Sequence, residues 1–86
     1  NKAEDFFNKG IAHFLLGDYL NASAAFESSV IQNRELGYGY YGLALVAMES
    51  GQFESARLYL EKASFYNPVL NEKIRMDPSV ESLLSF

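Results

Sequence analysis

The sequence has no cysteine and a single histidine, and both shortages exclude kinds of chemistry. Without a thiol there is no disulfide framework, no zinc ribbon and no cysteine nucleophile. The lack of cysteine suits an oxidising or a reducing compartment, so the location stays open. With only His13, a histidine-based catalytic triad and a metal site built from several imidazoles are not available. We expect His13 to be a partly buried packing residue.

Carboxylates outnumber cations, but they form no recognisable acid–base pair. The 11 acidic residues are dispersed along the chain. No two of them share a helix face with a partner that would separate their pKa values, as acid–base catalysis requires. We therefore predict no enzymatic activity, no metal and no cofactor.

Positive charge and long apolar runs are also scarce. The 7 lysines and arginines leave a formal net charge of −4, which argues against binding nucleic-acid phosphates. The longest apolar run, 43–48, is far shorter than the roughly 20 residues that span a bilayer, so we predict no membrane insertion. The start at Asn1 shows no signal peptide. Because this residue is not methionine, we expect the chain to be a segment of a longer protein.

The sequence does have ample apolar surface and an internal repeat. Apolar residues make up 49% of the 86 residues and aromatic residues 15%, which is enough for one small folded domain. A shift of the chain by 34 residues aligns 3–36 with 37–70, as a repeat architecture requires. The identical pairs are Gly17/Gly51, Ala22/Ala56, Glu27/Glu61, Asn33/Asn67 and Leu36/Leu70.

Each repeat predicts a helix, a tight turn and a second helix. Apolar residues recur at helical spacing on both sides of a break at Gly17 and of another at Gly51. Glycine supplies the left-handed backbone that ends a helix, and Asp18 is placed to cap the next one. Small residues such as Gly10 let helices approach closely, while large ones such as Phe26 fill the space between hairpins. The predicted fold is all-α, with stacked antiparallel helical hairpins.

This pattern of aromatic, small and glycine positions resembles the tetratricopeptide repeat family over 3–70. The second repeat fits well and has Pro68 at the family's closing proline, whereas the first departs at Lys9, His13 and Arg34. The resemblance implies a fragment of a right-handed superhelix. The pentatricopeptide RNA binders are the nearest alternative, but their longer period and basic groove do not suit this acidic chain.

The C-terminal segment, 71–86, does not continue as a third repeat. Pro78 would fall inside the first helix of that repeat, and proline is tolerated only in the first turn of a helix. We predict Asp77 as an N-cap, followed by a short helix to Phe86 that covers the last hairpin. The single domain 1–86 then consists of two repeats, 3–36 and 37–70, and a capping segment, 71–86.

The first helix of each hairpin lines a concave groove in the resembling family, where it holds a partner polypeptide. Carried over to this chain, the lining is Phe7, Ile11, Phe14, Leu15, Tyr38, Tyr41, Gly42, Leu45, Met48 and Glu49. An apolar and aromatic lining suits a protein–protein site. Family members that bind chaperone carboxy termini use lysine, asparagine and arginine at columns that here hold Phe7, Ile11, Gly42, Glu72 and Met76. No such binding is predicted.

Gly42 lies within a predicted helix, where glycine costs about 1 kcal/mol relative to alanine. Two interpretations stay open. One is the close approach of a ligand backbone or a neighbouring helix at the floor of the groove, and the other is a neutral change. The other lining side chains also have two interpretations, because they either meet a partner or pack against one another and under the C-terminal segment.

The leading functional hypothesis is an interaction module that binds an apolar or aromatic segment of a partner protein, without catalysis. The alternative is structural: the chain is part of a longer superhelix or forms a homo-oligomer, and Lys9 and His13 contact a preceding segment. A monomer that captures a peptide supports the first hypothesis. A concentration-dependent dimer that survives moderate salt supports the second, since apolar contacts are little screened.

Overall fold

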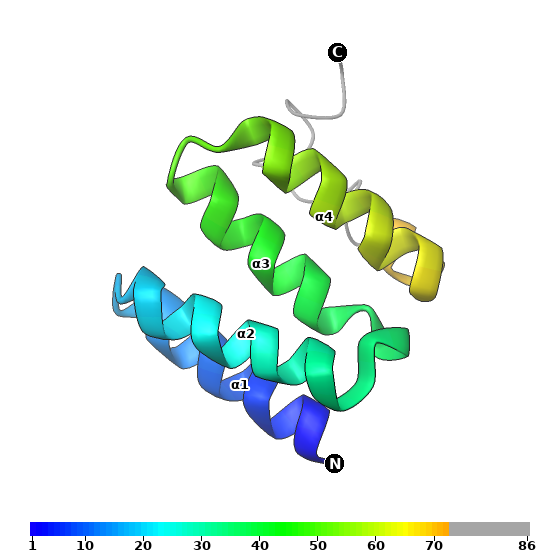
Figure 1. The fold of residues 1–86 in the computed structure, drawn as a ribbon, viewed down its shortest axis with the longest axis horizontal. Coiled ribbons are helices and arrows are strands. Elements are labelled where there is room, and N and C mark those ends of the chain that lie inside the picture. The colour runs from blue at the N-terminus through cyan, green and yellow to red at the C-terminus, as the bar shows by residue number, and fades with distance from the viewer. Residues whose placement is uncertain (73–86) are drawn as a thin grey trace.

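The computed structural model describes residues 1–72, and this part of the chain contains helices and no strand. The helices are α1 (Lys2–Leu15), α2 (Tyr19–Asn33), the 3-10 helix η1 (Arg34–Leu36), α3 (Tyr38–Glu49) and α4 (Phe53–Tyr66). Figure 1 shows α1 paired with α2 and α3 with α4, and α3 also packs against α2. The predicted all-α fold of stacked hairpins is confirmed. The capping helix predicted from Asp77 onward lies outside the described residues.

Both hairpin turns are built on a glycine in the left-handed region. Gly17 has φ 77° and Gly51 has φ 75°. No atom within 4 Å would oppose a Cβ at either position, so the backbone angle alone requires glycine. In the first turn the Asp18 amide donates to the His13 carbonyl at 2.9 Å, and the second turn makes the equivalent bond. These bonds close the helix ends, and both predicted breaks are confirmed.

Asp18 caps α2 as the sequence predicted. Its Oδ1 accepts a hydrogen bond from the Asn21 amide at 3.4 Å, and its Oδ2 accepts one from Asn21 Nδ2 at 2.7 Å. The same Oδ2 lies 3.3 Å from His13 Nδ1. The side-chain hydrogen bond from Asn21 is the main cause that lowers the Asp18 pKa from its usual 3.8, and the charge of His13 acts in the same direction.

Acid is expected to weaken the fold in part through Asp18. Because its folded-state pKa is lowered, the carboxylate contributes fully above its ordinary pKa, and this contribution is lost as the pH falls through the folded-state value. Asp18→Asn keeps a capping oxygen but does not titrate. Its urea unfolding midpoint should therefore fall less than that of the wild type between about pH 5 and about pH 2.5. Equal falls in the two proteins would show that Asp18 titration is not coupled to folding.

Two asparagines at equivalent repeat positions fix the segments that follow α2 and α4. Asn33 Oδ1 accepts from the Glu35 amide at 3.1 Å and caps η1. Asn67 Oδ1 accepts from the Val69 amide at 3.2 Å, and its Nδ2 donates to the Leu36 carbonyl at 2.8 Å. Asn67 therefore ties the end of α4 to the connection between the hairpins.

The long-range bond of Asn67 predicts an asymmetry between the two asparagines. Asn67→Asp keeps the acceptor for Val69 but removes the donor to the Leu36 carbonyl, so we expect the free energy of unfolding to fall by about 1–3 kcal/mol. The matched control is Asn33→Asp, which keeps the acceptor for Glu35 and should stay within about 0.5 kcal/mol of wild type. Urea unfolding followed by circular dichroism measures both. Equal losses in the two variants would contradict the role of the donor.

The core of the first hairpin centres on Phe26 of α2, whose side chain is fully buried. A Cβ placed on Gly10 of α1 would lie 2.5 Å from Phe26 Cε1, and one on Gly42 of α3 would be closer still to the same ring. Real side chains do not approach at such distances, so the ring occupies the space that two Cβ atoms would need. Phe26 thus packs within its own hairpin and against the next one.

Helix α3 is buried around most of its circumference. It packs against α2, α4 and, less extensively, α1, and seven of its twelve residues are buried. Tyr41, Ala44 and Ala47 pack in a cluster with α4 and with Leu70. A helix that is apolar on all sides belongs in a central position. In this central position α3 lies beside α1, and the predicted groove lining comes from these two helices.

Candidate functional site

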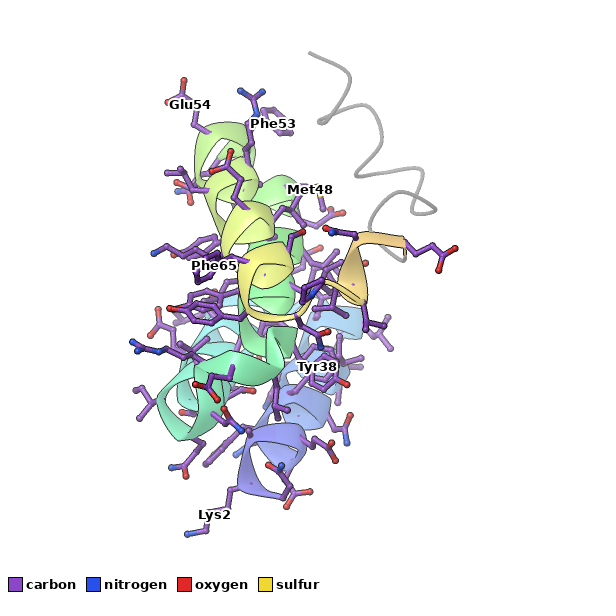
Figure 2. The ribbon with its side chains drawn as sticks, turned by 90° about the vertical axis from the view of Figure 1, so that its right-hand side faces the viewer. Lys2, Tyr38, Met48, Phe53, Glu54 and Phe65 are labelled. Carbon is purple, nitrogen blue, oxygen red and sulfur yellow. The ribbon has the colours of Figure 1, made fainter. Side chains whose placement is uncertain are left out.

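The predicted groove lining comes from α1 and α3, which are neighbouring helices of different hairpins. Phe7 of α1 meets Tyr38 of α3 with ring centroids 5.5 Å apart, so the first residue of α3 touches the first half of α1. Figure 2 shows Tyr38 and Met48 directed to the same side of the molecule. Side chains of two hairpins therefore meet at the Phe7–Tyr38 contact.

Six of the ten predicted lining residues are partly exposed and pack with one edge against the core. We call this surface the α1–α3 face, and its members are Phe7, Ile11, Phe14, Tyr38, Leu45 and Met48. Leu15 and Glu49 are exposed at the ends of α1 and α3. Contact of these eight residues with a partner stays a prediction.

Tyr41 and Gly42, the other two predicted lining residues, lie inside the helix packing. Tyr41 is 7% exposed and packs in the cluster that includes Leu70. Gly42 lies against the Phe26 ring, which takes the place of its Cβ. Of the interpretations of Gly42, the close approach of a neighbouring helix explains why a glycine stands there, because the Phe26 ring belongs to α2. Since both residues are covered by the chain itself, they are not part of the α1–α3 face.

The α1–α3 face carries no charged side chain. At the positions where family members that bind chaperone carboxy termini have lysine, asparagine and arginine, the described residues here are Phe7, Ile11, Gly42 and Glu72, while Met76 lies outside the described residues. None of these four side chains offers a cation to a carboxylate. The face therefore suits apolar and aromatic groups, with the Tyr38 ring as an amphipathic contact and Met48 as an adaptable one.

His13 lies away from this face, beside an open hollow on the outer side of the first hairpin. The hollow lies between α1 and α2 and is lined by Phe6, Lys9, His13, Asn21, Ala24, Ala25 and Ser28. The side chain of His13 is 29% exposed and faces Asp18, so it is partly buried, as expected. Residues 1–72 contain no group of three or more histidine and acidic side chains that could hold a metal ion.

Sequence reasoning missed a row of aromatic side chains on α3 and α4. Tyr40 stacks with Tyr59 and Tyr66 at ring-centroid distances of 6.5 and 5.7 Å. Lys62 lies over the Tyr40 ring and Arg34 over the Tyr66 ring, at 5.5 and 5.6 Å. Rings and cations cover one another's faces, so the row is a packed surface cluster. The seven-residue spacing of Tyr59 and Tyr66 on one face of α4 was the signal for it.

The architecture defines the class of protein, which is a repeat of antiparallel helical hairpins that bury their apolar faces against one another. The family follows from residues 38–68, which match the model of the tetratricopeptide repeat. The second hairpin is therefore a tetratricopeptide repeat, and the resemblance predicted from the sequence is confirmed. No curated protein and no solved structure matches the chain.

The match of residues 38–68 with this family has consequences of a general kind. Tetratricopeptide repeats generally mediate protein–protein interactions and are generally scaffolds without catalytic activity. Within residues 1–72, none of the helices has the length and apolar character needed to cross a membrane.

Proposed function

We propose that the chain is a protein–protein interaction module that binds an apolar or aromatic segment of a partner on the α1–α3 face. The observation that carries the proposal is the joining of two hairpins at this face, where Phe7 and Tyr38 lie in ring contact at 5.5 Å. A segment laid across both helices would meet side chains that are already held in place by the core. Little of their conformational freedom is then lost on binding.

The chemistry of the face selects the partner. Its partly exposed side chains are aromatic or aliphatic, so the partner's anchors are expected to be leucine, phenylalanine or similar residues. Because the face has no cation, a carboxylate or phosphate is not the feature that it recognises. The module needs no catalytic group for this role.

The test begins with a selection of displayed random 12-residue peptides on the purified chain. Peptides rich in apolar and aromatic residues are expected. Tyr38→Ala and Ile11→Ala should each weaken the selected peptides at least about tenfold, the usual effect of truncating an anchor contact. Leu58→Ala, which truncates a 59% exposed leucine of α4, is the matched control and should bind as the wild type does.

Two results would contradict the proposal. One is a set of selected peptides without apolar anchors. The other is binding that is equal in all three variants, with circular dichroism showing that each is folded.

The structural alternative, in which the chain is part of a longer superhelix, has less support at α1. In the second hairpin, α3 meets α2 through the small residues Gly39 and Gly42. The equivalent residues of α1, 34 positions earlier, are Asp5 and Asn8, and both are exposed. Polar side chains at these positions do not allow the close packing that glycine gives. A preceding helix could not pack on α1 as α2 packs on α3, and this favours the interaction module.

A further inference from the structure

We propose a second docking surface at the turn of the first hairpin, which takes a basic, amphipathic polypeptide segment. The surface is formed by Leu15, Leu16 and Leu20, and we call it the turn patch. It is separate from the α1–α3 face, although Leu15 is also among the residues predicted to line the groove. Its expected occupant has leucine-like anchors next to lysine or arginine side chains.

The turn patch exposes three large apolar side chains that take little part in the packing of the chain. Leu15 is 78% exposed, Leu16 82% and Leu20 84%. Single exposed leucines are common on protein surfaces and mean nothing. Three of them within six residues, on both sides of one tight turn, concentrate exposed apolar area at one end of the hairpin, and concentrated apolar area marks sites of interaction.

The second hairpin shows that the turn itself does not require these leucines. Its turn has the same left-handed glycine, with φ 75° at Gly51 against 77° at Gly17. The residues equivalent to Leu15, Leu16 and Leu20 are Glu49, Ser50 and Glu54, and all three are exposed. One chain therefore builds the same turn once with polar and once with apolar side chains. The geometry of the turn therefore does not explain the leucines.

The charges at the end of the molecule that holds both turns indicate the occupant of the turn patch. Figure 1 shows both hairpin turns at the same end of the molecule. This end carries the carboxylates of Asp18, Glu49 and Glu54, and the cation closest in sequence to the second turn is Arg57, within α4. Acidic groups beside an apolar patch attract a partner of opposite charge and repel one of like charge.

Charge also distinguishes between the possible occupants of the turn patch. A second copy of this chain would bring the same carboxylates toward the patch, and the whole chain has a net charge of −4. An anionic bilayer would be repelled for the same reason. A basic amphipathic segment can contact the leucines and pair with the carboxylates, and it is therefore the proposed occupant.

The experiment uses a fluorescein-labelled amphipathic peptide made of leucine and lysine, and fluorescence anisotropy with the full chain at low salt. The variant combines Leu15→Glu, Leu16→Ser and Leu20→Glu, so that the first turn takes the residues of the second. This variant is more acidic than the wild type. Attraction by charge alone would make it bind the basic peptide more tightly, whereas docking on the leucines should make it bind at least about tenfold more weakly.

The controls isolate the patch. Leu58→Glu, at an exposed leucine of α4 outside both surfaces, should bind the peptide as the wild type does. A peptide of leucine and glutamate should bind at least about tenfold more weakly than the leucine–lysine peptide, because it meets like charge. Higher salt should weaken the binding of the leucine–lysine peptide.

Several results would overturn the turn patch. The triple variant could bind the leucine–lysine peptide as tightly as the wild type or more tightly. Loss of binding in Tyr38→Ala alone would place the peptide on the α1–α3 face, which would support the proposed function and not the patch. A leucine-dependent dimer in sedimentation would identify a second copy as the occupant. Leucine-dependent binding to anionic vesicles would identify a membrane surface.

Discussion

Phe26→Ala should lower the free energy of unfolding by about 3–5 kcal/mol, which is the usual loss for a fully buried phenylalanine. The neighbours of the ring make a loss at the upper end of this range the expected one. Gly10 and Gly42 lie on the ring and have no side chains that could move into the vacated space. A small domain has about 5–15 kcal/mol of stability in total, so this one substitution should remove a large share of it and lower the unfolding midpoint strongly.

Thermal and urea unfolding followed by far-ultraviolet circular dichroism measure this effect. Phe65→Ala removes an aromatic ring that is 77% exposed, and it is the control for the loss of a phenylalanine as such. We expect less than about 1 kcal/mol there. Similar losses of free energy in the two variants would show that burial of the Phe26 ring contributes no more to stability than the exposed ring of Phe65.

Gly10→Ala and Gly42→Ala should each destabilise the fold, against the expectation from helix propensity. Alanine in place of glycine within a helix gains about 1 kcal/mol. Here the new methyl group would overlap the buried Phe26 ring, and overpacking of a core typically costs about 1–3 kcal/mol. The ring is rigid and enclosed, so we expect the overlap to outweigh the propensity and both variants to unfold at lower urea concentration.

The second repeat supplies the control for the glycine variants. Where the first repeat combines Gly10 with Phe26, the second combines Ala44 with Leu60. The second repeat therefore has alanine in place of glycine together with leucine in place of the larger phenylalanine. In a double-mutant cycle, Phe26→Leu should recover part of the loss caused by Gly10→Ala, with a coupling of about 0.5–3 kcal/mol. Strict additivity of the two losses would contradict a direct conflict between the methyl group and the ring.

The sequence predicted those parts of the fold that depend on local chemistry. The two breaks need a left-handed backbone, so glycine marks them, and the cap at Asp18 follows from its position after the first break. The repeat also indicated Gly10 as a small residue within the hairpin and Phe26 as a large one between hairpins, whereas their direct contact is known from the structure. These features depend on residues close together in the chain or related by the 34-residue shift.

The candidate site was harder to predict because its exposure depends on packing between hairpins. Tyr41 and Gly42 lie on the side of the predicted helix that periodicity leaves free. They are buried, because α3 has neighbours on several sides and Phe26 reaches it from the preceding hairpin. Periodicity describes the preferred buried face of a helix but not the number of its neighbours. The aromatic row of Tyr40, Tyr59 and Tyr66 was missed for the same reason, since it joins two helices.

The position of Phe26 between two glycines of different hairpins affects how the chain folds as a whole. In repeat proteins, stability is approximately the sum of the stability of each unit and of the contacts between neighbours. In this chain one ring contributes to both quantities, because it packs within its own hairpin and against α3 of the next. Neither hairpin can then lose its core without loosening the other. We therefore expect the two repeats to unfold as a single cooperative unit, although the sequence divides them into separate ones.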